Sequence, residues 1–170
     1  MIRNASPDDL PMILGIYNEV IAHTTSVYSE EPVSLANRLE WLRGREAAGY
    51  PVLVACDASG VTGFASFGDF RAWPCYCHTV EHSLHVRADR RGQGIGRTLL
   101  VELIARAAAA RKHVMIAGVD ADNQASIALH QSLGFEQAGL LKQVGRKFGR
   151  WLDLVFLQKI LAADGAQALA

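Results

Sequence analysis

The apolar positions of this chain change period several times, and each change predicts a new element of secondary structure. A helical spacing begins after Ser6-Pro7-Asp8-Asp9, where Ser6 would be the N-cap, Pro7 the residue N1 and Asp9 the residue N3. The apolar residues with this spacing are Leu10, Ile13, Leu14, Tyr17 and Ile21. A second helix is predicted from Ser34 to about Ala48, and its apolar face would be formed by Leu35, Leu39 and Leu42.

Strand patterns occupy the middle of the chain. A short first strand is expected at 1–5, and two longer ones at 51–56 and 61–70, joined by a hairpin turn at Asp57-Ala58-Ser59-Gly60. Residues 71–76 break the regularity and predict a loop. The β-branched, alternating residues 79–86 then predict a further strand.

The last third alternates between helix and strand. Helices are predicted at 94–111 and 123–133, a strand at 114–119, and two final strands at 135–144 and 151–160 around a loop at 145–150. Hairpin strands followed by a strand–helix–strand–helix unit indicate an α/β (α+β layered) domain with helices on the faces of a mixed, mostly antiparallel sheet. Without an internal repeat or linker, we expect a single domain over 1–162 and a frayed tail at 163–170.

Charge and composition exclude several classes of function. Seventeen basic residues balance seventeen acidic ones, so we expect no nucleic-acid partner. No apolar run reaches membrane-spanning length and the N-terminus lacks the apolar stretch of a signal peptide, so no membrane association is expected. Three cysteines, an odd number, favour reduced thiols and a cytoplasmic location. Cys75-Tyr76-Cys77-His78 has no second ligand pair, so we predict no metal site.

The most informative segment runs from 86 to 100, where a strand ends, a basic glycine-rich loop follows and a helix begins. Glycines at 92, 94 and 96 let backbone N–H groups converge at the helix N-terminus, which favours a bound phosphate or pyrophosphate. Arg90, Arg91 and Arg97 add positive charge. A P-loop is excluded because Gly-Lys-Ser/Thr is absent, and a dinucleotide fingerprint because position 97 is arginine rather than glycine.

The pattern Arg91-x-x-Gly94-x-Gly96 resembles the pyrophosphate loop of acetyl-CoA-binding transferases. Together with Asn123-Gln-Ala-Ser-Ile-Ala-Leu-His130 and Leu133-Gly134-Phe135, it resembles the central motifs of the GNAT acetyltransferase superfamily. The resemblance implies a GNAT-like fold with acetyl-CoA as the acetyl donor. It also implies the following cofactor-binding residues: Leu84, His85 and Val86 on the strand; Arg91, Gly92, Gln93, Gly94, Ile95, Gly96, Arg97 and Thr98 in the loop and helix; Asn123 and Ser126 on the next helix.

A narrower resemblance is carried by four further blocks: Thr24-Thr-Ser-Val-Tyr28, Phe67-Gly-Asp-Phe-Arg71, Thr79-Val-Glu-His-Ser83 and Val144-Gly-Arg-Lys-Phe-Gly-Arg-Trp-Leu-Asp153. These look like blocks of the phosphinothricin and methionine sulfoximine acetyltransferases. That likeness implies free amino-acid analogues as acceptors, and a homodimer.

Transfer of an acetyl group to an amine requires a base, because the amine is mostly protonated at neutral pH. Glu81 is the candidate, and the narrower resemblance places the family's proposed catalytic glutamate there. Strand alternation puts Glu81, Ser83 and His85 on one face, and apolar surroundings should raise the pKa of the Glu81 carboxyl. A solvated sheet carboxylate or an ion-pair partner is the alternative interpretation.

The departing thiolate also calls for a proton donor. Many superfamily members use a tyrosine for this role, but no tyrosine lies between positions 77 and 170. His130 is a candidate donor, and a histidine that only packs or caps the helix is an equally good interpretation.

An amino-acid acceptor carries a carboxylate, which a guanidinium can bind in bidentate fashion. Arg71 is the first candidate for this contact, with Lys147 and Arg150 as alternatives that a dimer interface would supply. Aromatic residues are expected to wall the acceptor pocket or to be ordinary core and rim aromatics; they are Tyr28, Phe70, Trp73 and Tyr76.

Two alternatives to a small amino-acid acceptor stay open. One is an acetyltransferase for a protein N-terminus, a lysine or a polyamine, although the Arg71 region is not acidic as a polyamine site would be. The other is a non-catalytic acyl-CoA-binding sensory module, against which the presence of Glu81 argues.

Overall fold

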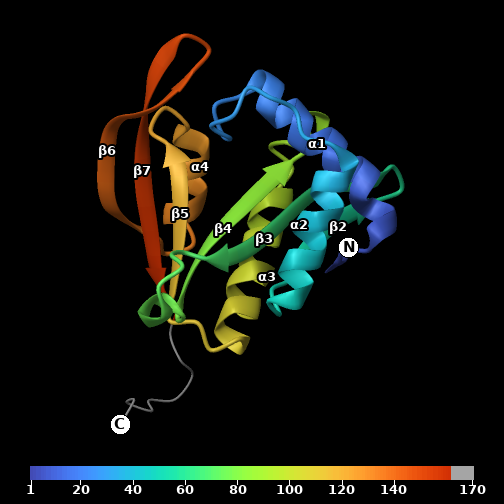
Figure 1. Ribbon diagram of the computed structural model, residues 1–170, viewed down its shortest axis with the longest axis horizontal. Helices are drawn as coiled ribbons and strands as arrows, with labels where there is room; N and C mark the ends of the chain where they lie inside the picture. The colour runs from blue at the N-terminus through green and yellow to red at the C-terminus, as the bar shows by residue number, and fades with distance from the viewer. Residues whose placement is uncertain (162–170) are drawn as a thin grey trace.

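In the computed structural model, which describes residues 1–161, seven strands form one sheet in the order β1-β2-β3-β4-β5-β7-β6 (Figure 1). Neighbouring strands are antiparallel except for β4 and β5, which are parallel. The predicted mixed, mostly antiparallel sheet is therefore confirmed. The strands are β1 (Ile2–Asn4), β2 (Val52–Asp57), β3 (Gly60–Asp69), β4 (Thr79–Val86), β5 (Val114–Asp120), β6 (Glu136–Lys147) and β7 (Arg150–Ile160).

Two helices cover each face of the sheet. In Figure 1, α2 (Leu35–Ala47) lies in front of the sheet and α3 (Ile95–Ala109) behind it. One apolar core joins α1 (Leu10–His23) and α2 to the sheet through residues such as Ile13, Leu42 and Phe64. A larger core joins α3 and α4 (Gln124–Gln131) to the opposite face through residues that include Leu99, Leu103, Phe67 and Met115. The layered α/β architecture follows from these two cores.

Local signals explain where the first helices begin. Ser6 precedes a 3-10 turn, η1 (Pro7–Asp9), and its backbone N–H donates to Asp9 Oδ2 at 2.8 Å. The α-helix itself begins at Leu10, three residues later than the predicted start at Pro7. Ser34 caps α2 as expected, since its Oγ accepts a hydrogen bond from Asn37 N at 3.2 Å.

The prediction of a loop at 145–150 is wrong. β6 continues to Lys147 and β7 begins at Arg150, so the connection is a two-residue turn at Phe148 and Gly149. Both turn residues have positive φ, 52° and 75°, as tight hairpins of this length require. The apolar alternation was obscured because β6 contains an irregularity between Leu141 and Gly145, where the register shifts. The predicted tail at 163–170, like residue 162, lies outside the described residues.

The central strands separate from each other halfway along their length. β4 and β5 pair only at Thr79–Val114, Val80–Met115 and Glu81–Ile116, although the strands continue to Val86 and Asp120. Figure 1 shows the two strands starting together and then diverging. Among residues 1–161, the edge of β4 that faces β5 therefore has no strand partner beyond Glu81, while the opposite edge stays paired with β3.

Within residues 1–161, no helix is long and apolar enough to cross a membrane. The same part of the chain contains no group of three or more His, Cys, Asp or Glu side chains placed to hold a metal ion.

Candidate active site

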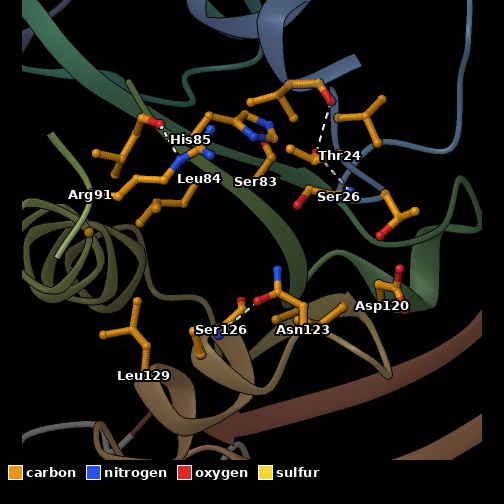
Figure 2. Close-up of a pocket in the computed structure, with 18 of the residues that line it drawn as sticks. Thr24, Ser26, Ser83, Leu84, His85, Arg91, Asp120, Asn123, Ser126 and Leu129 are labelled. Carbon is orange, nitrogen blue, oxygen red and sulfur yellow. Dashed lines mark hydrogen bonds between the residues drawn. The ribbon is translucent and has the colours of Figure 1, made fainter. Parts of the chain in front are cut away.

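The gap between β4 and β5 opens into a cavity of about 1150 Å³. Its walls come from the end of α1, from β4 and β5, from the start of α3 and from α4. Figure 2 shows Thr24 and Ser26 on one side of this hollow and Asn123 and Ser126 on the opposite side. An elongated ligand could thus enter between two sheet strands and contact main-chain groups along its length.

The phosphate-binding signal predicted from the glycine-rich loop has a structural counterpart at the N-terminus of α3. Gly92 and Gly94 have φ of +75° and +80°, and Gly94 is the N-cap residue. No side chain caps the helix there, so the first backbone N–H groups stay available to an anion. Most of the predicted loop residues line the cavity, namely Arg91, Gly92, Gly94, Ile95, Gly96 and Arg97.

Two predicted loop residues are placed differently. Gln93 and Thr98 are absent from the cavity wall formed by residues 1–161. The Gln93 amide donates to the carbonyl of Asp89 at 3.3 Å, and Thr98 Oγ1 donates to the carbonyl of Gly94 at 3.1 Å. Both side chains therefore hydrogen-bond to nearby main-chain carbonyls. They shape the loop instead of lining the cavity.

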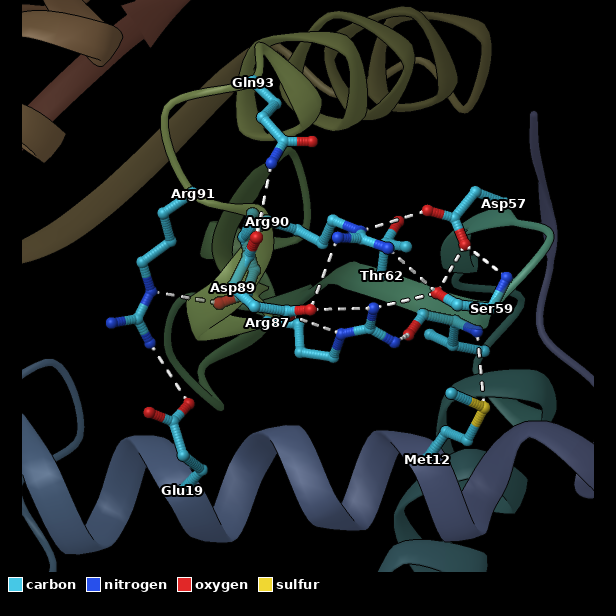
Figure 3. A network of polar contacts seen from close by, with 12 residues as sticks. Met12, Glu19, Asp57, Ser59, Thr62, Arg87, Asp89, Arg90, Arg91 and Gln93 are labelled. Atoms are coloured by element: carbon cyan, nitrogen blue, oxygen red, sulfur yellow. Dashed lines mark hydrogen bonds and ion pairs between the residues drawn. The ribbon is translucent and has the colours of Figure 1, made fainter.

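Acidic residues hold the arginines that precede α3 (Figure 3). Arg87 pairs with Asp89 at 2.6 Å, and Arg90 pairs with Asp57 at 3.1 Å. Arg91 differs, because it bridges two elements: Nη2 donates to Glu19 of α1 at 3.2 Å and Nε to the carbonyl of Val86 at 3.2 Å. The loop is therefore tied both to β4 and to the helix on the far wall of the cavity.

The main chain of β4 supports the predicted contact with an amide-bearing arm. The carbonyl of His85 points towards β3, since it lies 3.0 Å from where a Cβ on Gly63 would be. Neighbouring residues of a strand direct their main-chain groups to opposite edges, so Leu84 and Val86 direct theirs into the gap. The His85 side chain is buried against Tyr17 and Phe64, and burial lowers its pKa to about 4. His85 therefore pairs with β3 through its backbone and packs through an uncharged side chain.

Asn123 caps α4 and faces the cavity. Its Oδ1 accepts from Ser126 N at 3.1 Å, which fixes the orientation of the amide. Figure 2 shows the amide nitrogen directed into the hollow. A free donor is thus presented at the predicted position of the ligand's arm.

Glu81 lies in a second hollow, of about 310 Å³, beside the main cavity. The two hollows adjoin, because Arg45, His82, Ser83 and Gly118 line both. Burial raises the pKa of the Glu81 carboxyl, as expected, and the positive charge of Arg71 partly opposes this rise. A raised pKa makes the carboxylate a stronger proton acceptor, as a general base requires.

His130 makes a different set of contacts from those expected of a proton donor. It is 4% exposed, and its Nδ1 lies 2.7 Å from the carbonyl oxygen of Ser126, which can only accept. Nδ1 therefore carries the proton, and burial keeps the ring neutral by lowering its pKa. The other nitrogen, Nε2, lies 3.0 Å from Nε2 of His82 and must accept from it. The neutral pair leaves His130 no free proton for a thiolate, and the packing interpretation describes it better.

The predicted acceptor residues of the 70–76 loop lie outside both hollows. Arg71 stacks on the ring of Phe70 at 4.2 Å, the Phe70 and Tyr76 rings are 5.9 Å apart, and Trp73 is 74% exposed. None of the four belongs to the walls formed by residues 1–161. Only Arg71 has a link to the site, through its electrostatic effect on Glu81.

Lys147 is not free to meet a carboxylate, contrary to expectation. It is 1% exposed, and its Nζ donates to the carbonyls of Ile21, Thr24 and Val27 at 2.6, 2.7 and 2.8 Å. All three ammonium protons are therefore used in holding the end of α1. Arg150 does line the main cavity and pairs with Asp122 at 2.9 Å.

The ring of Tyr28 lies directly over Gly145 of β6, so closely that a Cβ on Gly145 would collide with it. The Tyr28 hydroxyl donates to the carbonyl of Asp153 at 3.2 Å. It is absent from the walls of both hollows as residues 1–161 form them. The tyrosine therefore connects the segment after α1 to the β6–β7 hairpin.

Three buried side-chain atoms lack a hydrogen-bond partner among residues 1–161, and all belong to residues that line the hollows: Arg45 Nε, His82 Nδ1 and Asp120 Oδ2. Buried polar atoms are normally paired, so their concentration here marks a place built for a ligand. Sequence analysis missed all three residues. His82 falls on the strand face opposite Glu81, and Arg45 and Asp120 belong to no motif; only the fold brings them to the site.

The gap in the sheet, the N–H groups at the start of α3 and the free amide of Asn123 together fit a ligand with a pyrophosphate and an amide-bearing arm. This combination defines a coenzyme A-dependent acyltransferase. Residues 13–135 match the acetyltransferase (GNAT) family, and the chain belongs to that family. The protein is an acetyl-CoA-dependent N-acetyltransferase.

Known relatives support the same conclusion. The L-methionine sulfoximine/L-methionine sulfone acetyltransferase of Pseudomonas aeruginosa is 54% identical over 158 residues, which is 92% of each chain. A phosphinothricin acetyltransferase from Sinorhizobium meliloti, solved in complex with acetyl-CoA, superposes with a TM-score of 0.95 at 38% identity, covering 100% of this chain and 92% of that one. A structure described as a ribosomal-protein-alanine N-acetyltransferase from Brucella melitensis has a TM-score of 0.93 at 53% identity, covering 95% and 99%.

Proposed function

We propose that this protein transfers the acetyl group of acetyl-CoA to the α-amino group of a small amino-acid-like acceptor, of the methionine sulfoximine or phosphinothricin type. The observation that carries the proposal is the small hollow around Glu81, which adjoins the main cavity and is only about 310 Å³ in volume. A hollow of this size suits an amino acid better than a peptide chain. The names of the relatives from P. aeruginosa and S. meliloti point to the same class of acceptor.

In the proposed mechanism Glu81 is the general base. Its carboxylate removes a proton from the acceptor's ammonium, directly or through a water molecule, so that the amine's lone pair can attack the thioester carbonyl. The new C–N bond forms as the C–S bond breaks, coenzyme A leaves as its thiolate, and the thiolate takes up a proton from water or from the acetylated nitrogen. Bound acetyl-CoA supplies that activated acetyl group. The N-terminus of α3 holds the pyrophosphate, and Leu84, Val86 and Asn123 orient the arm that leads to the thioester.

The sequence predicts Arg71 for the acceptor's carboxylate, but Arg71 lies outside the walls that residues 1–161 give the two hollows and would act at their entrance. The influence of Arg71 on the pKa of Glu81 supports a position near the reacting amine. Phe70, Trp73 and Tyr76 belong to the same loop and would form the outer rim of the acceptor pocket, and Arg150 would close the main cavity from the side of β7.

Release of free thiol from acetyl-CoA tests the proposal directly. The acceptors to compare are methionine sulfoximine, phosphinothricin, the common amino acids, a polyamine and a short peptide with an N-terminal alanine. We expect release with the amino-acid analogues at a kcat/KM well above that for the peptide. Release only with the peptide or the polyamine would overturn the proposed acceptor class.

The name of the relative from B. melitensis favours one competing acceptor, the N-terminus of a ribosomal protein. Such an acceptor needs an open groove for several residues beyond the amine. The peptide arm of the same assay decides between the two candidates, because a preference for the peptide over methionine sulfoximine would favour the protein substrate.

We also propose a homodimer built on the outer end of the sheet. β6 is an edge strand that exposes apolar side chains on its surface, and β7 beside it does the same; they include Leu140, Leu141, Val144 and Trp151. An exposed apolar edge of this kind is normally covered. Sedimentation should give twice the monomer mass, and Leu140→Glu with Trp151→Glu should yield monomers. A monomeric wild-type protein would contradict the proposal.

A cytoplasmic location and a role in resistance to toxic amino-acid analogues are further proposals. The three cysteines are free thiols, as a reducing compartment would keep them. Growth of a sensitive bacterium on methionine sulfoximine should be restored by the wild-type gene but not by a Glu81→Gln version. Equal sensitivity with and without the gene would refute the resistance role.

A further inference from the structure

Arg45 reaches from α2 onto the sheet beside the candidate base. Its guanidinium lies directly over Gly68 of β3, so closely that a methyl group on Gly68 would overlap Nη1 and Cζ. Gly68 is the position in β3 that pairs with Glu81 of β4. Directly opposed residues of antiparallel strands project from the same face, with Cβ atoms about 5 Å apart. The guanidinium and the Glu81 side chain therefore lie on the same face of the sheet, and both residues line the small hollow.

The positive charge of Arg45 is only partly offset, by the carboxylate of Asp69, which lines the same hollow. Within residues 1–161 its guanidinium forms no ion pair, and its buried Nε has no hydrogen-bond partner. Asp69, whose charge acts on Arg45, also accepts a hydrogen bond at Oδ1 from the hydroxyl of Tyr50. A buried Nε–H without a hydrogen-bond partner is costly, and an anionic ligand in the hollow would supply that partner.

The part of the sheet that lines this hollow carries few side chains. Glycine occupies position 68 in β3 and position 118 in β5, on either side of Glu81. A Cβ on Gly118 would lie 3.2 Å from Glu81 Oε1, so any larger residue would crowd the carboxyl. The two glycines thus leave space in one hollow that is lined by the carboxylates of Glu81 and Asp69 and by the guanidinium of Arg45.

We propose that Arg45 binds the α-carboxylate of the acceptor while Glu81 faces its α-ammonium, so that the hollow recognises a zwitterionic α-amino acid. This inference rests on the proposed function and names the residue that selects its substrate. The fork of N–H donors on Arg45 matches the two oxygens of a carboxylate. Arg71, the guanidinium expected from the sequence, stacks on Phe70 outside the hollow and belongs to its approach.

A substrate-and-mutant cycle tests this assignment. The two substrates are methionine sulfoximine and the corresponding amine that lacks the α-carboxylate; the variants are Arg45→Gln and Arg71→Gln. Losing a charge-assisted bidentate contact should reduce kcat/KM about 10- to 100-fold. We expect Arg45→Gln to show this loss with methionine sulfoximine, mainly through the acceptor KM, and little change with the decarboxylated amine or in the KM for acetyl-CoA.

Two further variants separate binding from folding. Gly68→Ala leaves the charge intact but displaces the guanidinium, so it should also raise the acceptor KM selectively. Arg43→Gln, on the exposed side of the same helix, is the matched control and should behave like wild type. If Arg45→Gln fails to fold, the selective effect of Gly68→Ala still decides the question.

The outcomes are distinct. A carboxylate-dependent loss in Arg45→Gln or Gly68→Ala supports the assignment. A larger carboxylate-dependent loss in Arg71→Gln, equal losses with both substrates, or an unchanged acceptor KM would overturn it. Wild-type protein that acetylates no amino acid would instead refute the proposed function itself, before any variant is compared.

Discussion

His82 donates a hydrogen bond from Nε2 to Nε2 of His130 across 3.0 Å, inside the core that joins β4 to α4. The rings are nearly parallel, with an interplanar angle of 22°. Because His130 carries its proton on Nδ1, the bond exists only while Nε2 of His130 is unprotonated. Protonation of His130 would place two N–H groups face to face, and protonation of His82 at Nδ1 would bury an unpaired charge, so acid should loosen the contact between the central strand and the helix that Asn123 caps.

The first prediction concerns stability at low pH. Burial lowers the pKa of His82 from 6.5 to about 3. Between these values the unfolded chain binds a proton that the folded protein does not, so the free energy of unfolding should fall as the pH drops through this window, by up to about 1.4 kcal/mol per pH unit for this ring. His82→Gln removes the titrating group but keeps a donor for His130. Urea denaturation at several pH values should give a shallower slope for this variant.

The control for this prediction is His113→Gln, since His113 is exposed and outside the core. That variant should keep the wild-type slope. Identical slopes for wild type and His82→Gln would mean that the buried ring takes up its proton in the folded state, and the neutral-pair assignment would then be wrong.

A second prediction concerns the general base. Glu81→Gln should lower kcat about 10²- to 10⁴-fold while acetyl-CoA still binds. Because burial raises the pKa of Glu81, wild-type kcat/KM should decrease as the pH falls through that raised value, where the carboxylate becomes protonated. Steady-state rates across pH would show this acid limb, and Glu81→Gln should lack it.

Glu40→Gln, on the exposed side of α2, is the matched control and should leave both kcat and the pH profile unchanged. Near-normal turnover by Glu81→Gln would remove Glu81 from the role of base. The solvated-carboxylate interpretation would then stand.

Local sequence signals are sufficient to predict much of the fold and the glycine-rich loop of the candidate site. The caps at Ser6 and Ser34, the hairpin at 57–60 and the glycines before α3 act on residues only a few positions away. Such short-range requirements can be recognised in one sequence. This is why most residues predicted for the cofactor loop line the main cavity, whereas those predicted from the 70–76 loop line neither hollow.

Contacts that depend on register or on distant segments could not be recognised in this way. Arg45 reaches the site because Gly68 and Glu81 are paired across two strands, a relation that no local spacing reveals. Lys147 looked like a free cation in a loop, yet it binds Thr24, which is 123 positions away. The hairpin was missed because the bulge between Leu141 and Gly145 interrupts the alternation of β6.

A third prediction tests the anion site at α3. Gly94 has a φ of +80°, a conformation that costs a residue with a side chain about 1–2 kcal/mol. Gly94→Ala should therefore disturb the N–H groups that face the pyrophosphate and raise the KM for acetyl-CoA about 5- to 30-fold, by the same free energy. The acceptor KM should change little. Initial rates with each substrate varied in turn measure both constants.

Gly15→Ala is the control for the glycine substitution. No atom lies within 4 Å of the position of its Cβ in α1, so alanine fits and should stabilise the helix by about 1 kcal/mol without changing either KM. An unchanged KM for acetyl-CoA in Gly94→Ala would show that the loop tolerates the methyl group or binds no phosphate.

The last prediction concerns the buried ammonium of Lys147, which holds the carbonyls of Ile21, Thr24 and Val27. Lys147→Met keeps the length of the side chain but leaves three carbonyl oxygens without their donor. At about 1 kcal/mol or more for each lost bond, the free energy of unfolding should fall by about 3 kcal/mol. Thr24 and Val27 line the cavity, so turnover should fall as well. Lys142→Met, exposed on the same strand, should change stability by less than about 0.5 kcal/mol in the same urea titration. Equal stability of the two variants would mean that water replaces the ammonium at the end of α1.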